Sequence, residues 1–195
     1  MNYPTRILLT ACAAFATSIA TAQLKLAPNV AFRNDIQRVV EDYSHGFTTI
    51  KGAAVEQGPQ TVTYASKLTP NGSGEASIVQ YSSGGKAIYS FQTTLLVTET
   101  YKEAAKKYSW LYTQLKGMNV KHVVDNYTLQ GRFEAPDESK GFAISTLTLA
   151  SPPPPLQKLR VEVTLQYEMP NWKVGLVIFE KERDDKEGGS NGNDE

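Results

Sequence analysis

This sequence has only two histidines, and its serine and carboxylate side chains form no recognisable motif for acid–base or metal chemistry. Neither His45 nor His122 has a second histidine or a group of carboxylates at metal-ligand spacing. Ser73 stands between two glycines in a turn-like segment, and the sequence contains no G-x-S-x-G motif. Glu41 and Asp42 are adjacent, so on a helix they point in different directions. We therefore expect no catalytic residue set, no metal site and no cofactor.

One alternative from the enzyme class is a small extracytoplasmic hydrolase with a site near His122. Val120 and Val124 share its face of an expected strand, which favours a partly buried, hydrogen-bonded histidine. A pocket that joins His122 to a carboxylate within hydrogen-bond reach would favour the hydrolase instead.

The segment from Thr100 to Gly117 predicts an amphipathic helix. Thr100 and Glu103 have the spacing of a capping box, and Gly117 is typical of the left-handed residue that follows a helix. The apolar side chains form one continuous stripe: Tyr101, Ala104, Ala105, Tyr108, Leu111, Tyr112 and Leu115.

Trp110 lies opposite that stripe. At about 100° per residue the stripe spans roughly 280° through 0° to 40°, whereas Trp110 falls near 180°. The expected polar neighbours on this face include Glu103, Lys106, Lys107 and Gln114. A tryptophan among lysines is typical of an interface hot spot, where ammonium groups pack around the ring or over its face. We predict that these five residues bind a protein partner or a second copy of the chain; the alternative is that another part of the chain covers Trp110.

Several tyrosines lie in strand patterns, which gives a second alternative, a carbohydrate-binding domain. Their frequency also follows from the β-propensity of tyrosine alone, and the sequence does not fix which of them share a face. The candidates are Tyr64, Tyr81, Tyr89, Tyr127 and Tyr167.

A first helix is expected from Val30 to Ser44, with Asn29 as N-cap and Gly46 after its end. Alternating or apolar runs bounded by Gly, Pro, Asn and Ser predict strands. In the last run but one, Leu159, Val161 and Val163 alternate with polar residues, so one face meets the core and the other meets water. The expected strands are Thr61–Leu68, Glu75–Tyr81, Lys86–Val97, Val120–Gln130, Gly141–Ala150, Lys158–Met169 and Trp172–Lys181.

These elements predict an α+β fold in which two helices pack on a largely antiparallel sheet of about seven strands. The expected order is α-β-β-β-α-β-β-β-β, and the two halves have the pattern of a duplicated α-β-β-β unit. This order resembles that of bacterial secretion chaperones. The resemblance covers element order only and includes no shared motif, and those chaperones act in the cytoplasm.

Residues 1–22 have the pattern of a cleaved secretory signal, with Arg6, an apolar run and the small triplet Ala20-Thr21-Ala22. We therefore expect an exported protein, periplasmic or secreted, with one domain over 23–182 and a disordered polar tail over 183–195. Cys12, the only cysteine, lies inside the signal, so the cleaved chain has no disulfide. A minority interpretation makes Cys12 the lipid anchor of a lipoprotein.

Charge excludes one class of partner. The chain has 20 basic and 20 acidic side chains. Cleavage after Ala22 removes Arg6 and leaves 19 against 20, a net charge of −1. This balance provides no field for a phosphate backbone, so we expect no nucleic acid partner. The apolar run before Ala22 is too short and too polar to span a membrane.

Overall fold

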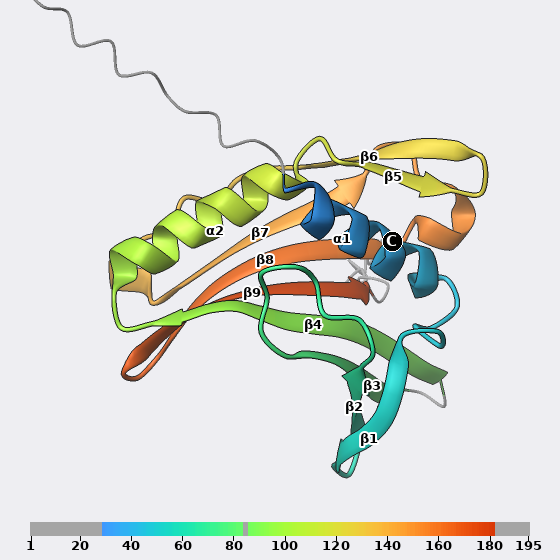
Figure 1. Cartoon of the computed structure of the whole chain (residues 1–195), viewed down its shortest axis with the longest axis horizontal. Coiled ribbons are helices and arrows are strands. Elements are labelled where there is room, and N and C mark those ends of the chain that lie inside the picture. Colours follow the sequence, from blue (N-terminus) through green and yellow to red (C-terminus); the bar gives the residue numbers. More distant parts are fainter. Residues whose placement is uncertain (1–28, 84–85, 182–195) are drawn as a thin grey trace, which may run out of the picture.

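A computed structural model describes residues 29–83 and 86–181. The predicted signal 1–22 and the tail 183–195 lie outside the described residues. Within them, helices α1 (Val30–Tyr43) and α2 (Tyr101–Leu115) cover one face of a single sheet (Figure 1). The strands are β1 (Lys51–Gln57), β2 (Thr61–Ser66), β3 (Ala76–Ser83), β4 (Lys86–Thr98), β5 (Asn119–His122), β6 (Asp125–Gly131), β7 (Phe142–Leu149), β8 (Leu159–Glu168) and β9 (Asn171–Glu180).

The strand order across the sheet is β1-β2-β3-β4-β9-β8-β7-β6-β5, and every neighbouring pair is antiparallel. Each helix is followed by a meander that runs from one edge of the sheet to its centre, where β4 pairs with β9. The predicted α+β class with two helices on an antiparallel sheet is confirmed. The predicted count of about seven strands is wrong, because the described residues form nine, with four after α1 and five after α2.

The two additional strands have separate causes. The segment predicted as one strand, Val120–Gln130, is a hairpin of β5 and β6 that turns at Val123, whose φ is +58°. A valine rarely adopts this conformation, so the sequence gives no turn signal there. Strand β1 was not predicted because Gly52 and two alanines have low β-propensity. It forms because its backbone pairs with that of β2.

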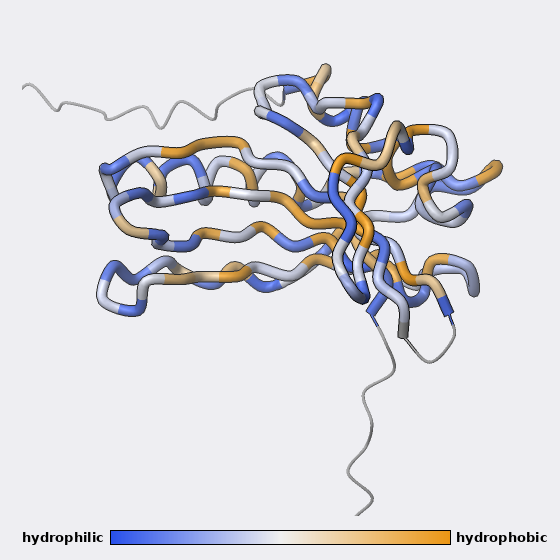
Figure 2. Tube along the Cα trace, turned by 90° about the horizontal axis from the view of Figure 1, so that it is seen from below, coloured by the Kyte–Doolittle hydropathy of each residue, from blue (hydrophilic) through white to orange (hydrophobic). Residues whose placement is uncertain are grey.

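The core lies between the helices and the sheet. Hydrophobic and hydrophilic residues alternate along the strands, as Figure 2 shows. On β8 the predicted inward residues Leu159, Val161 and Val163 are all buried. The ring of Trp172 on β9 is also buried, and its centroid lies 5.0 Å from that of Tyr101 at the start of α2. Burial of a large apolar side chain of this kind stabilises the fold by about 1.5–3 kcal/mol.

The predicted capping box of α2 does not form. Thr100 is the N-cap, but its side chain makes no capping hydrogen bond. Instead the Thr98 hydroxyl donates to the Glu103 carboxylate at 2.9 Å and accepts from the Thr100 amide at 3.1 Å. The hydroxyl that bonds the N-cap amide and the Glu103 carboxylate thus belongs to Thr98 at the end of β4. No helix in the described ranges has the length and apolarity to cross a membrane.

Candidate functional site

Trp110 lies where α2 meets α1. Its ring centroid is 6.0 Å from that of Phe32 on α1, with the planes inclined at 50°, and the Lys107 Nζ lies 4.2 Å above the ring. Trp110 is half-buried and packs against the core. Partial burial lowers the pKa of the Lys107 ammonium below its ordinary value. Part of the Trp110 ring is therefore covered by α1 and the core, as the alternative to a partner-binding role expects.

The other predicted neighbours of Trp110 are dispersed. Lys106 and Glu103 are exposed, and Glu103 is engaged by Thr98. Gln114 is only 2 % exposed, and its Oε1 accepts a hydrogen bond from the Asn29 amide at 2.7 Å. The chain crosses the end of α2 as it enters α1, which buries a residue that helix periodicity alone assigns to the polar face. A partner surface on these residues stays a prediction.

His122 ends β5 and lies opposite Asp125 across the hairpin. The part of the chain that the structure describes contains no hydrogen bond from His122 to a carboxylate. Nor does that part contain three or more His, Cys, Asp or Glu residues grouped to hold a metal ion. The hydrolase alternative thus gains no geometric support at His122.

The strand register separates the five tyrosines. Tyr64 and Tyr89 lie on the helix-covered face, where the Lys51 ammonium is 5.0 Å and 4.6 Å from their ring centroids. Tyr127 is paired with buried Val120, and Tyr167 with buried Trp172, which assigns both to the same covered face. Of the five, only Tyr81 lies on the opposite face, so the strand tyrosines form no common row.

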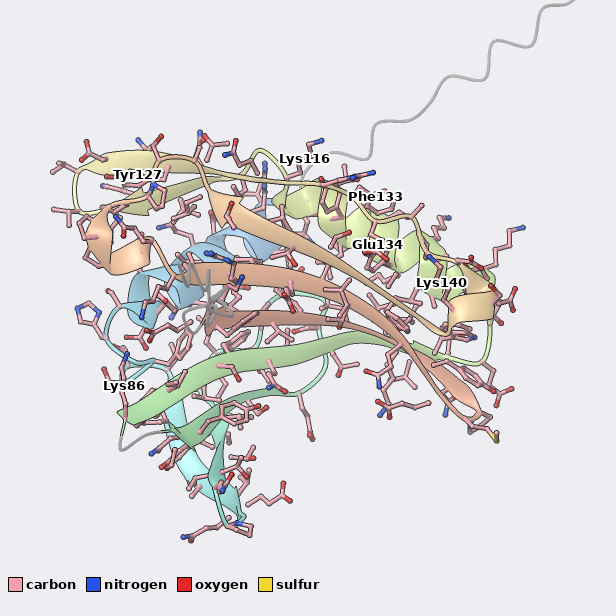
Figure 3. The ribbon with its side chains drawn as sticks, turned by 180° about the vertical axis from the view of Figure 1, so that it is seen from behind. Lys86, Lys116, Tyr127, Phe133, Glu134 and Lys140 are labelled. Atoms are coloured by element: carbon pink, nitrogen blue, oxygen red, sulfur yellow. The ribbon has the colours of Figure 1, made fainter. Side chains whose placement is uncertain are left out.

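That opposite face is the open face, defined here as the side of β2–β4 and β7–β9 that neither α1 nor α2 covers. Figure 3 looks onto it, with Lys86 and Lys140 near its two ends. The pairing of neighbouring strands aligns its residues in rows across the sheet. One row contains Thr94, Gly175, Thr164 and Ile144, and the next contains Ser77, Gln92, Val177, Glu162 and Thr146.

Three adjoining depressions hollow the open face. The central one measures about 350 Å³ and shares Gln92 and Val177 with a second of about 540 Å³. It shares Thr164 and Gln166 with a third of about 460 Å³. Thr61 of β2 and Glu162 of β8 line the second depression together although three strands separate them, so the sheet is concave there. The depressions together form one trough across the open face.

Gly175 forms part of the floor of this trough. A Cβ at this position would lie 2.9 Å from the Thr164 Oγ1 and 3.4 Å from the Thr93 carbonyl oxygen. A glycine inside a strand often marks the close approach of another group to the backbone. Here it leaves a gap between the threonines on either side, Thr94 and Thr164.

Hydrogen-bonding groups remain free in the central depression. Among the described residues, the side chains of Ser77, Thr94, Thr164 and Gln166 make no hydrogen bond within the chain. Lys173, the single cation that lines this depression, forms an ion pair with Glu168. The middle of the trough therefore offers uncharged hydroxyl and amide groups.

Among the residues that line the trough, four carboxylates stand against the two ammonium groups of Lys140 and Lys173. Glu162 is held only by the Thr146 hydroxyl at 3.1 Å. Glu180 accepts hydrogen bonds from Lys86 at 3.0 Å and Lys158 at 3.2 Å. Partial burial raises the pKa of the Glu180 carboxyl, but these two ammonium groups outweigh it and lower the pKa below its ordinary value.

In comparisons with family models, curated proteins and solved structures, nothing matches this chain. The function must therefore be argued from its own residues. Sequence reasoning assigned the outward residues of β8 to water but missed the trough, because its shape depends on which strands are neighbours. The available signal was Gly175, a glycine inside an otherwise apolar strand pattern.

Proposed function

We propose that this chain is an exported, non-catalytic binding module whose ligand lies in the trough of the open face. The supporting observation is the row of three adjoining depressions along a sheet face that the helices leave uncovered. The expectation of export rests on the signal pattern of residues 1–22.

Free side-chain groups support a binding role for the open face. The unpaired hydroxyls of Thr94 and Thr164 point to ligand contacts, since an unused hydrogen-bonding group in a depression gains a partner when a ligand enters. Phe142 and Tyr81, 57 % and 40 % exposed, add apolar surface near the two ends of the trough. An exposed aromatic ring beside a depression can pack on the apolar part of a ligand.

The shape of the trough favours an elongated ligand. Each depression is shallow, whereas sites for small molecules usually enclose most of the ligand surface. The shared residues Gln92 and Thr164 make the depressions continuous, so one long ligand can occupy all three.

Single-cysteine footprinting tests this proposal. Cleavage of the signal removes Cys12, so one introduced cysteine is the only thiol in the cleaved chain. We would compare Gln166→Cys in the trough with Lys106→Cys beside Trp110 and Lys102→Cys on α2 as a control. All three positions are exposed. The measured quantity is the maleimide labelling rate with and without cell-envelope extract.

The expected result is labelling slowed at least fivefold at position 166 and unchanged at 102 and 106. Slower labelling at 106 alone would assign binding to the Trp110 surface of α2. Equal rates with and without extract at every position would contradict a binding role for the open face.

A further inference from the structure

We infer that the ligand of the trough is a glycan, specifically a chain of uncharged hexose units. This inference rests on the proposed binding function of the open face and names its ligand class.

The free groups of the central depression match sugar hydroxyls. A threonine hydroxyl both donates and accepts, and a glutamine amide offers two donors and an acceptor. Thr94 and Thr164 flank the gap at Gly175, and Gln166 follows on the next row of the same face. A sugar hydroxyl also donates and accepts, so it can pair with each of these side chains.

The charges of the trough disfavour anionic ligands. Four carboxylates line the trough, those of Glu75, Glu162, Glu168 and Glu180, against two ammonium groups, those of Lys140 and Lys173, and Lys173 is paired with Glu168. A phosphate backbone or an acidic polysaccharide requires the opposite distribution, with cations in excess. A neutral polymer enters such a trough without this repulsion.

Exposed rings near the two ends suit the apolar faces of sugar rings. Phe142 lines the third depression and Tyr81 the second. The two rings lie four strand spacings apart across the sheet and several residues apart along the strands. From the usual strand spacing and rise, the distance between them is about 30 Å. A short chain of sugars spans this distance, whereas a single sugar does not.

An extended peptide fits this face less well. A peptide brings one amide donor and one carbonyl acceptor per residue, which proteins usually satisfy with the backbone of a strand edge. The open face presents side chains only, and Val177 and Phe179 interrupt its polar groups. The footprinting experiment below distinguishes a protein ligand from a glycan.

The experiment is titration calorimetry with neutral hexasaccharides of glucose, mannose and galactose in several linkages. Thr164→Val removes one hydroxyl at nearly constant volume, and Phe142→Ala removes one exposed ring. Thr113→Val is the matched control, because Thr113 is exposed on α2 and its hydroxyl donates to the Ser109 carbonyl. We expect at least one hexasaccharide to bind, with affinity at least fivefold weaker in the two trough variants and unchanged in the control.

The inference is overturned if no hexasaccharide binds, or if the trough variants bind as tightly as the wild type. Footprinting at position 166 separates this failure from failure of the binding function. Protection that protease treatment of the envelope extract abolishes would keep the function and replace the glycan with a protein. An absence of protection by untreated extract would remove both proposals.

Discussion

The hydroxyl oxygens of Tyr108 and Ser145 lie 2.6 Å apart beneath α2, and Ser145 is fully buried. Ser145 Oγ also accepts a hydrogen bond from the Glu134 amide at 2.9 Å. One side chain of β7 thus fixes both the helix above it and the loop that leads to β7. Burial of the phenol raises the pKa of Tyr108 above its ordinary value.

Replacement of Ser145 by alanine should lower the free energy of unfolding by about 1–3 kcal/mol, since it leaves the buried Tyr108 hydroxyl and the Glu134 amide without their shared partner. Urea denaturation measures this change. Ser109→Ala on α2 is the control, because that hydroxyl only donates to the Ala105 carbonyl within its own helix. An equal effect of the two substitutions would show that the buried pair has no special role.

Removal of the Trp110 ring should also destabilise the fold, because the ring packs on Phe32 and the core. We expect Trp110→Ala to lower the free energy of unfolding by about 1–3 kcal/mol, below the cost at a fully buried site. Thermal or urea denaturation measures the loss, with Lys106→Ala as an exposed control. Unchanged stability would instead favour the predicted role of Trp110 as a partner anchor.

The outer edge of the sheet at β5 is closed by a side chain. The Gln37 amide of α1 donates to the Lys121 carbonyl at 2.8 Å and accepts from the Lys121 amide at 2.9 Å, as a neighbouring strand would. Gln37→Ala should speed hydrogen exchange of the Lys121 amide roughly fivefold, in line with about 1 kcal/mol for the lost bonds. Exchange at the Val163 amide in the sheet centre provides the internal control, and an unaltered rate at Lys121 would contradict the account.

The hairpin between β5 and β6 contains a strained residue. Val123 has a φ of +58° and is exposed, and β-branched residues adopt this conformation at a cost of about 1–3 kcal/mol. Val123→Asn should therefore raise the free energy of unfolding by about 1 kcal/mol, because asparagine tolerates positive φ. The same change at Val124, whose φ is not positive, should give no gain; equal gains at both positions would refute the strain.

Acid should weaken the fold through Glu180. Its pKa in the folded chain lies below its ordinary value because of Lys86 and Lys158, so folding is favoured while the carboxylate is ionised. This contribution is present above the unfolded pKa and is lost as pH falls through the lower folded value. We expect a loss of less than about 1 kcal/mol, since the pairs are exposed.

Stability measured from pH 6 to pH 2.5 tests this effect. The wild type should lose more stability over that range than Glu180→Gln, whereas Glu99→Gln in an exposed loop should follow the wild type. A variant at position 180 with the wild-type acid dependence would rule the contribution out.

Local patterns predicted much of the fold but little of the candidate site. The stripe on α2 and the alternation on β8 identified elements whose periodicity is set by burial on one side. Gln114 was misassigned because its burial depends on where α1 crosses α2, which a single helix does not reveal. The trough depends on the pairing of β4 with β9, strands about eighty residues apart in sequence, so only the assembled sheet brings Thr94, Gly175 and Thr164 together.

Ligand binding in the trough is measured most directly by a methyl and indole NMR spectrum of the wild-type chain, recorded with and without its envelope extract. This one experiment observes signals from both candidate surfaces, the trough and the Trp110 surface of α2, without any substitution. Binding in the trough should shift or broaden the methyl signals of Ile144 and Val177 and leave the Trp110 indole signal unchanged. Changes confined to Trp110 and its neighbour Leu111, with the trough methyls unaffected, would contradict it.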